Sequence, residues 1–279
     1  MTVFEIMKFG SNLLKENKIP SHILDAELLL SKVLKKSREE ILINLNLDIN
    51  KKSVSKYKEY LKRRSRNEPV AYILGEKEFW SKKFSITKNA LIPRPETELL
   101  VEKLIQIYEN KKIIILDIGT GSGCIILSLL SNLENSTGIG VDISNGSISL
   151  AKKNAIIHKL SHRTKFFGKS FEKVFNKKFD LIVSNPPYIE AKDIKNLSDD
   201  IKKYEPRTAL DGGNDGLDLI RKIIYKSKRI LKINGMLALE IGNEQYKKVS
   251  KILVNNNFRV KHVIKDYKNN IRCVLAEYN

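Results

Sequence analysis

The chain has 279 residues, of which 42% are hydrophobic, and a formal net charge of +19 at pH 7. This length suits one large and one small domain, and the hydrophobic content is enough to bury a core. The two cysteines exclude a disulfide framework and a cysteine-based metal cluster, and the four histidines indicate no metal site. Without a signal pattern or a membrane-length apolar run, the chain is expected to be soluble and cytoplasmic, with no membrane partner.

The excess of positive charge has two readings. A partner rich in negative charge, such as nucleic acid or a nucleoprotein particle, would explain it. A base-composition bias in the genome would also explain it, because the chain is visibly rich in lysine, asparagine and isoleucine. Charge alone therefore does not assign a function.

Residues 1–74 predict a small bundle of four helices. Apolar residues at helical spacing indicate the first two helices, over 2–17 and from a Ser21 cap to about Lys36. Ser37 and Glu40 match a capping box, which starts a third helix over 38–45, and a fourth covers 51–66. The fourth helix ends in a basic cluster, read either as a solvated helix end or as a contact with RNA or another acidic partner: Lys62, Arg63, Arg64 and Arg66.

Residues 75–92 predict a β-hairpin that connects two domains. Apolar and polar residues alternate on both sides of Trp80, as in a short hairpin. Pro95, followed by acidic residues, then predicts the first turn of a helix that runs to Tyr108.

From residue 93 to 279, predicted strands and helices alternate, which is typical of an α/β fold. The pattern predicts a doubly wound, mostly parallel, Rossmann-like sheet of seven strands. The predicted strands cover 113–118, 138–143, 164–167, 179–184, 236–241, 258–264 and 271–277. Predicted helices cover 124–133, 145–159 and 217–231, the last one closed by Asn234-Gly235.

The segment Gly119-Thr120-Gly121-Ser122-Gly123, between the first of these strands and a helix, is a candidate cofactor loop. A glycine-rich turn lets a ligand approach the backbone and meet the N–H groups of the helix. Cys124 stands where a dinucleotide fingerprint requires glycine, and no Gly-Lys-Ser/Thr follows as in a P-loop. With Asp117 the loop reads D-x-G-x-G-x-G, which is typical of loops that bind S-adenosylmethionine. A glycine turn packed tightly under a helix is the alternative.

Asp142 follows the second strand and is a candidate ribose ligand. It lies 23 residues after Gly119 (142 − 119), close to where an acidic residue bonds ribose hydroxyls in dinucleotide sites. The same residue could cap the helix 145–159. We interpret the loop and this carboxylate together as a site for a nucleoside cofactor.

The turn Asn185-Pro186-Pro187-Tyr188 ends the strand 179–184 and is the candidate reaction centre. Its two prolines lack N–H donors and fix φ, so the strand stops there and the turn is stiff. The side-chain oxygen of Asn185 and the carbonyl oxygen of Pro186 can together receive both protons of a planar –NH2 group. Tyr188 can supply an aromatic wall for a flat amide or base. A proline-rich turn without a chemical role is the alternative.

The predicted topology brings the two candidate sites together. Ligands in doubly wound sheets lie at the carboxyl ends of the strands, where the strand order reverses. Strands 113–118 and 179–184 are neighbours in such a sheet, so the glycine loop and the Asn-Pro-Pro-Tyr turn share one cleft. Asn185 would then face the sulfonium of the methyl donor.

Over nearly its whole length the chain resembles the bacterial release factor glutamine methyltransferases. Besides the glycine loop and the Asn-Pro-Pro-Tyr turn, the resemblance rests on Arg63-Arg64, Glu68-Pro69-Val70-Ala71-Tyr72-Ile73-Leu74-Gly75, Leu91-Ile92-Pro93-Arg94-Pro95-Glu96-Thr97-Glu98, Val141-Asp142-Ile143-Ser144, Glu205-Pro206-Arg207-Thr208-Ala209-Leu210 and Gly212-Gly213. The Asn-Pro-Pro-Tyr turn is the least specific of these, because adenine-amino methyltransferases also use it.

The resemblance implies a fold, a reaction and a set of site residues. It implies a substrate-recognition domain over 1–74, a linker over 75–92 and an S-adenosylmethionine-dependent methyltransferase domain over 93–279. The implied substrate is the glutamine of the Gly-Gly-Gln loop in peptide chain release factors, whose methylation modulates translation termination. By the same carry-over Gly119–Gly123 and Asp142 hold the cofactor, and Asn185–Tyr188 hold the glutamine amide, with Asn185, Pro186 and Tyr188 as catalytic residues.

Two segments depart from the family pattern. The family often has an acidic residue followed by Trp or Leu after the third strand, near the adenine. Here the chain reads Lys169-Ser170-Phe171, so Ser170 or Phe171 is the expected adenine wall. Near the C-terminus, Asp266–Arg272 replaces a tighter turn, which affects the expected shape of that loop.

Two other functions remain open at this stage. An adenine-amino methyltransferase acting on DNA or RNA would share the amino-group chemistry and explain the basic charge, although no added domain resembles a base-reading module. A catalytically silent scaffold on the ribosome or RNA would have no need of both acceptors in the Asn-Pro-Pro-Tyr turn. The favoured prediction is therefore a monomeric enzyme that requires no stable nucleic-acid partner.

Overall fold

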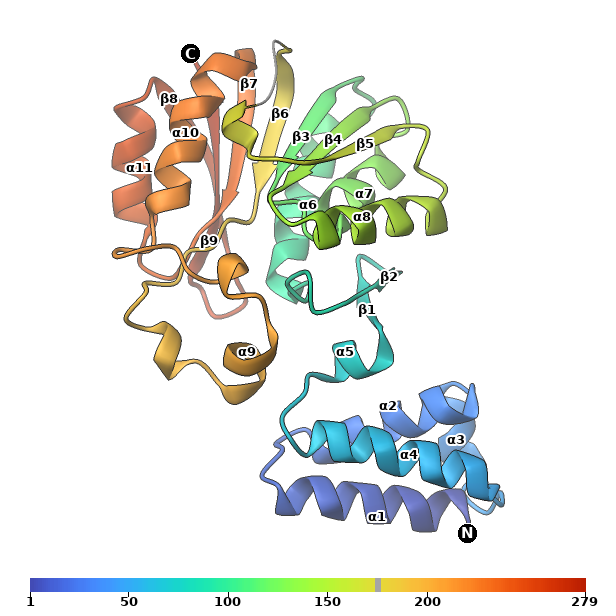
Figure 1. Ribbon diagram of the computed structural model, residues 1–279. Coiled ribbons are helices and arrows are strands. Elements are labelled where there is room, and N and C mark those ends of the chain that lie inside the picture. Colours follow the sequence, from blue (N-terminus) through green and yellow to red (C-terminus); the bar gives the residue numbers. More distant parts are fainter. Residues whose placement is uncertain (174–176) are drawn as a thin grey trace. The chain divides into compact units, whose positions relative to one another are not determined.

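The computed structural model describes residues 1–173 and 177–279 (Figure 1). The chain divides into two compact units. Met1–Glu76 and Ser198–Tyr204 form the first, here called the helical unit, and Lys77–Leu197 with Glu205–Asn279 form the second, the sheet unit. None of the described helices combines the length and apolar character that crossing a membrane requires.

The helical unit contains the four predicted helices and two more. They are α1 (Val3–Glu16), α2 (His22–Leu34), α3 (Arg38–Ile43), α4 (Lys51–Arg64), α5 (Val70–Leu74) and α9 (Asp199–Tyr204). The capping box of α3 is present, because the Glu40 N–H donates to the Ser37 hydroxyl and the Ser37 N–H donates to the Glu40 carboxylate. Ser21 is the N-cap residue of α2 as expected, but its side chain makes no capping bond, since its hydroxyl donates to the Asp25 carboxylate at 2.7 Å.

The basic cluster at the end of α4 follows neither predicted reading as a whole. Arg64 is buried, and its Nε donates to Asp25 at 2.7 Å. Arg63 makes two bonds to the Glu68 carboxylate, at 2.8 and 2.9 Å. These two arginines therefore tie α4 to α2 and to the segment that precedes α5.

The hairpin that follows consists of β1 (Glu76–Phe79) and β2 (Lys82–Ser85), which form a two-stranded sheet. Trp80 and Ser81 connect the strands and both have positive φ, 52° and 54°, as a two-residue type I′ turn requires. The predicted β-hairpin is present.

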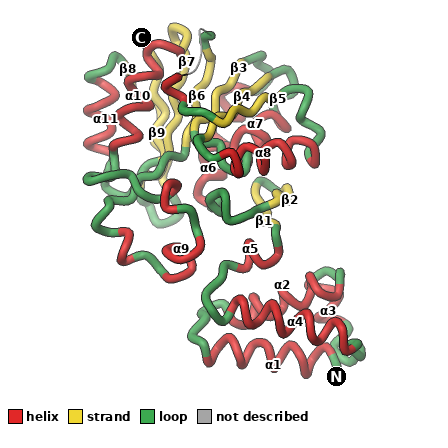
Figure 2. The backbone as a smooth tube through the Cα atoms, in the orientation of Figure 1, coloured by secondary structure: helices red, strands yellow, loops and turns green. Residues whose placement is uncertain are grey.

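The sheet unit is built on seven strands in the order β5-β4-β3-β6-β7-β9-β8. Their bounds are β3 (Ile114–Ile118), β4 (Thr137–Asp142), β5 (Thr164–Gly168), β6 (Phe179–Ser184), β7 (Leu231–Glu240), β8 (Phe258–Lys265) and β9 (Ile271–Tyr278). All pairs from β5 to β7 are parallel, and β9 runs antiparallel to both of its neighbours. The predicted doubly wound, mostly parallel, seven-stranded sheet is confirmed (Figure 2).

Helices cover the sheet in two groups (Figure 1). Their bounds are α6 (Pro95–Tyr108), α7 (Cys124–Asn132), α8 (Asn145–Ile157), α10 (Asp218–Ile230) and α11 (Tyr246–Val254). The chain leaves β3 toward β4 through α7, and leaves β6 in the opposite direction toward β7 through α10. Because such crossovers are right-handed, α7 and α10 lie on opposite faces of the sheet.

One predicted boundary is wrong. Asn234-Gly235 was expected to close a helix, but α10 ends at Ile230 and both residues lie inside β7. Asn234 has a φ of +61°, and the pairing of β7 with β6 shifts register in this stretch. The positive φ of Asn234 therefore belongs to a bulge in β7. This strand begins at Leu231, directly after the last residue of α10.

The strand order places a site at the carboxyl ends of β3, β4 and β6. After β3 the chain builds β4 and β5 on one side, then returns to place β6 on the other side of β3. The order of the sheet therefore reverses between β3 and β6, where doubly wound folds bind ligands.

Candidate functional site

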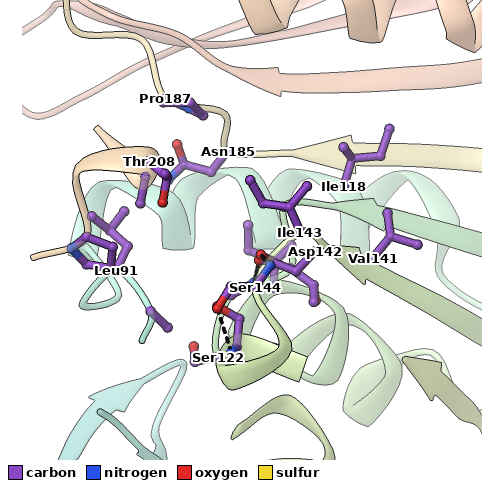
Figure 3. A pocket seen from close by; sticks show the side chains of 18 of the residues that line it. Leu91, Ile118, Ser122, Val141, Asp142, Ile143, Ser144, Asn185, Pro187 and Thr208 are labelled. Atoms are coloured by element: carbon purple, nitrogen blue, oxygen red, sulfur yellow. Dashed lines mark hydrogen bonds between the residues drawn. The ribbon is translucent and has the colours of Figure 1, made fainter. Parts of the chain in front are cut away.

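A cavity of about 310 Å³ lies at this reversal point. Nine of the twelve residues that the sequence nominated line it: Gly119, Thr120, Gly121, Ser122, Asp142, Ser170, Phe171, Asn185 and Pro187. In Figure 3, Asn185 and Pro187 come from the loop after β6, and Asp142, Ile143 and Ser144 from the end of β4. The cavity thus joins the candidate cofactor loop to the candidate reaction centre.

The glycine loop is open where it faces the cavity. Gly119, Gly121 and Gly123 have φ of +72°, +54° and +80°, in the left-handed region that favours glycine. A Cβ on Gly119 would meet no atom within 4 Å, whereas a Cβ on Gly123 would press against Leu127 at 3.2 Å. The loop therefore leaves backbone accessible at its start and packs against α7 at its end, and Gly123 does not line the cavity.

Asp142 holds the loop in place from the end of β4. Its Oδ2 accepts the Gly121 N–H and its Oδ1 accepts the Ser144 N–H, both at 2.9 Å. Burial raises the pKa of this carboxyl group, while those backbone bonds lower it. Ser144, and not Asp142, caps α8 through its hydroxyl.

The loop and the carboxylate fit the nucleoside cofactor that the sequence suggested. The open backbone at Gly119 is a cradle that any side chain would fill, and each Asp142 oxygen keeps acceptor capacity beyond its one bond. Ser170 and Phe171 line the same cavity, with Phe171 buried. A flat aromatic group therefore has an apolar side chain available in this region.

Asn185 lies across the cavity from the loop, at the end of β6. Its Nδ2 donates to the Thr97 hydroxyl at 3.3 Å. Among residues 1–173 and 177–279, no donor to its Oδ1 is present within hydrogen-bond distance. The oxygen is therefore available to a ligand that carries N–H groups.

The other residues of the turn take different positions. Pro187 lines the cavity, but Pro186 and Tyr188 are absent from its lining. The Tyr188 ring packs on the core beside the sheet, and its hydroxyl donates to Glu240 at 3.4 Å. Tyr188 thus supports the turn from behind in this structure, where the sequence had suggested an aromatic wall.

Two carboxylates near the site were not nominated from the sequence. Glu240, at the end of β7, is buried and accepts the Thr97 hydroxyl at 2.6 Å. Glu205 is also buried, pairs with Arg94 and accepts the Ile92 N–H at 3.3 Å. Arg94 and Thr97 line the cavity. Three of these four residues stand in segments that carried the family resemblance, which was the available signal; Glu240 had none.

Comparison with known proteins decides the family. A model described as the PrmC N-terminal domain matches residues 5–75, and one described as the methyltransferase small domain matches residues 95–203. The release factor glutamine methyltransferase of Clostridium botulinum is 40% identical over 280 residues, which cover 99% of each chain. The chain belongs to this family. The resemblance drawn from the motifs is confirmed.

A second relative and a solved structure agree with this membership. The release factor glutamine methyltransferase of Fusobacterium nucleatum is 40% identical over 95% of this chain and 75% of its own length. A crystal structure of a methyltransferase from Pyrococcus furiosus superposes with a TM-score of 0.55 at 16% identity, covering 77% of this chain and 98% of that one. The structural match shows the fold alone. As a member of the family the chain is a protein-glutamine methyltransferase.

Proposed function

We propose that this release factor glutamine methyltransferase transfers a methyl group from S-adenosylmethionine to the side-chain amide nitrogen of the glutamine in the Gly-Gly-Gln loop of peptide release factors. The observation that carries the proposal is the unused Oδ1 of Asn185, which lines one cavity with the glycine loop. A primary amide has the N–H groups that such an acceptor binds. The relatives' names supply the release factor as substrate.

The glycine loop, Asp142 and the region of Ser170 and Phe171 are the groups that hold the cofactor in this proposal. The open backbone at Gly119 and the start of α7 face the cofactor, and the Asp142 oxygens accept from ribose hydroxyls. When bound, S-adenosylmethionine supplies an electrophilic methyl group and leaves as a neutral thioether. No metal takes part in the proposed reaction.

The protein's own task is to make a poor nucleophile reactive. An amide nitrogen shares its lone pair with the carbonyl group, so position and charge stabilisation matter more than basicity. Asn185 Oδ1 and the Pro186 carbonyl accept the two amide protons, which aims the nitrogen lone pair and stabilises the positive charge that grows on it. The nitrogen then loses one proton to solvent water after the transfer, so the reaction needs no general base among these residues. Pro187 completes the binding site of the amide, and Tyr188 supports the turn from behind.

The helical unit is proposed to hold the release factor. It matches the PrmC N-terminal domain model, and the cavity residues all belong to the sheet unit. The enzyme is expected to act as a monomer in the cytoplasm.

A methyl-transfer assay with labelled S-adenosylmethionine tests the proposal. A release factor, the same factor with Ala in place of the Gly-Gly-Gln glutamine, and an adenine-containing oligonucleotide are offered separately, and the labelled peptide is located by mass spectrometry. Label on the glutamine, absent from the Ala factor, is the expected result. Label on the oligonucleotide alone would assign an adenine-amino methyltransferase, and no label on any of them would contradict the proposal.

A further inference from the structure

Behind Asn185 a chain of hydrogen bonds leads through α6 to the end of the neighbouring strand β7. Asn185 Nδ2 donates to Thr97 Oγ1 at 3.3 Å, and Thr97 Oγ1 donates to Glu240 Oε2 at 2.6 Å. Tyr188 donates to the other Glu240 oxygen at 3.4 Å. These residues come from α6, from the end of β7 and from the turn after β6. One carboxylate therefore contacts both ends of the Asn-Pro-Pro-Tyr turn, directly at Tyr188 and through a hydroxyl at Asn185.

The direction of these bonds follows from counting protons. An ionised carboxylate accepts hydrogen bonds and donates none, so the single proton of the Thr97 hydroxyl must go to Glu240. The Thr97 oxygen can then only accept from Asn185, which requires the amide nitrogen to face Thr97. A neutral partner in place of Glu240 could donate to Thr97, and the Thr97 proton could then bond Asn185 Oδ1 with the amide turned over.

We propose that Glu240 and Thr97 are positioning residues, which turn the Asn185 side chain so that its oxygen, and not its nitrogen, is presented to the amide substrate. The inference rests on the proposed function, because only a substrate with N–H groups needs the oxygen. A turned-over Asn185 would present donors to donors and repel the substrate's –NH2 group.

Burial of Glu240 is costly, which argues against a role in packing alone. The residue is 2% exposed, and a buried ionised carboxylate costs several kcal/mol unless it is well paired. Within the described residues its hydrogen-bond partners are two neutral hydroxyls, whereas nearby Arg272 bonds to Asp266 at 2.9 Å. An apolar residue would suit the sheet core better, so the acceptor-only character of the carboxylate is the property that this position uses.

The same burial makes the chain of hydrogen bonds from Glu240 through Thr97 to Asn185, here called the relay, sensitive to pH. Burial raises the pKa of Glu240 to about 7, against the opposing effects of the Thr97 bond and the Arg272 charge. Other titratable groups that face it are Glu96 on α6, Tyr188 in the turn, Cys124 on α7 and Cys273 on β9. Below pH 7 a protonated Glu240 can donate to Thr97, so the bond direction is no longer imposed on Asn185.

Paired substitutions at Thr97 provide the test. Thr97→Val keeps the shape without the hydroxyl, and we expect kcat for release factor methylation to fall about tenfold, as the loss of one hydrogen bond worth about 1.4 kcal/mol predicts. Thr97→Ser restores a hydroxyl and should recover most of that loss. Cofactor affinity, measured by titration, should change less than threefold in both, on the order of ordinary context effects.

A matched control separates this effect from loss of stability. Thr164 is also buried and its hydroxyl donates to the Leu160 carbonyl at 2.9 Å, outside the cavity. Thr164→Val removes a comparable bond and should leave kcat unchanged. Equal loss of kcat in Thr97→Val and Thr97→Ser, or wild-type kcat in Thr97→Val, would overturn the proposal.

Glu240→Gln tests the direction of the relay. The new side chain has nearly the same shape but can donate as well as accept, so kcat at pH 8 should be lower in the variant than in the wild type. In the wild type, activity should fall below pH 7 as Glu240 becomes protonated. This fall should be absent in Glu240→Gln. The same pH dependence in wild type and variant would overturn the proposal, provided both melt cooperatively. If Glu240→Gln does not fold, the Thr97 pair decides alone.

A spectroscopic readout keeps the inference separate from the proposed function. If the wild type methylates no release factor, the proposed function fails, and the relay is then judged by NMR of the Asn185 side-chain amide, assigned through its absence in Asn185→Ala. We expect its proton shifts to titrate near pH 7 in the wild type and to be independent of pH in Glu240→Gln. Shifts that titrate alike in both proteins would overturn the relay.

Discussion

Two carboxylates of the helical unit and two near strand ends of the sheet unit are buried in opposite ways. In the helical unit Asp25 is 5% exposed and bonds to the buried Arg64, and Glu68 is 6% exposed and bonds twice to Arg63. In the sheet unit Asp117 and Glu240 are buried as deeply, yet among the described residues their side-chain partners are hydroxyl groups.

The two carboxyl groups bonded to hydroxyls have raised pKa values. Burial raises the pKa of Asp117 and that of Glu240 to about 7, because a hydroxyl neutralises no charge. Asp117 is the residue before the last in β3, Glu240 is the last residue of β7, and each bonds to a threonine that lines the cavity. In these four residues, ion-paired burial ties helical segments together, whereas burial against hydroxyl groups alone, here called acceptor-only burial, lies next to the proposed reaction site.

Arg64→Ala tests the paired type and should have the largest effect. It leaves Asp25 buried with only the Ser21 hydroxyl as a side-chain partner, and breaking such a pair costs about 3–5 kcal/mol. Urea unfolding followed by circular dichroism measures the loss. The double variant Arg64→Met, Asp25→Leu removes both charges and should recover most of it. A double variant no better than Arg64→Ala would mean that the arginine acts through its other bond, to the Glu68 carbonyl.

Asp117→Asn tests the acceptor-only burial of a carboxylate through the pH dependence of the unfolding free energy. Burial raises the Asp117 pKa from its ordinary value of 3.8 to about 7, so the folded state binds an extra proton between these two pH values. Wild-type stability relative to the Asn variant is then greatest below pH 4 and falls as pH rises to 7, by about 4 kcal/mol in all, of which about 3 kcal/mol is lost between pH 5 and 8. Unfolding free energies at pH 5 and 8 in both proteins measure this. A difference that does not change with pH would show that Asp117 is an ordinary ionised carboxylate.

Much of the sheet unit was predictable because its signals are local. The strand β3, the glycine loop and the start of α7 are one continuous run of about 20 residues, and Pro95 marks the start of α6. Except for Gly123, the site residues nominated along this run lie on one cavity with Asn185, since parallel strands end at a common edge.

The missed features depend on contacts between distant segments. Thr97 lies 88 residues from Asn185 and 143 from Glu240, and no sequence pattern states that α6 brings its hydroxyl between them. Arg64 looked solvated because its partner Asp25 is 39 residues away. Asn234-Gly235 looked like a helix end because positive φ has the same sequence signature in a bulge and in a cap.

Asn185→Ala tests whether Asn185 Oδ1 serves the reaction; this side chain is linked to the Glu240 carboxylate through Thr97. Loss of one charge-stabilising group should lower kcat about 10²-fold, equal to about 2.7 kcal/mol, while cofactor affinity stays nearly constant. Asp142→Ala is the matched variant on the opposite side of the cavity and should weaken cofactor binding first. A near-normal rate in Asn185→Ala would remove the basis of the proposed function.

Arg63→Ala completes the comparison within a single helix and should have the smallest effect. Arg63 neighbours Arg64 on α4, but its side chain is 36% exposed, so the position it leaves is open to water. Water can then solvate the Glu68 carboxylate in place of the guanidinium group, and a partly exposed pair contributes only about 1 kcal/mol. Added salt should narrow the difference between wild type and Arg63→Ala, because it screens the exposed partner, and should leave the Arg64→Ala difference intact. If urea unfolding gave equal losses of unfolding free energy for Arg63→Ala and Arg64→Ala, burial of the arginine would not determine the cost of breaking the ion pair. The contrast between paired and acceptor-only carboxylates assumes that it does, so this result would contradict that contrast.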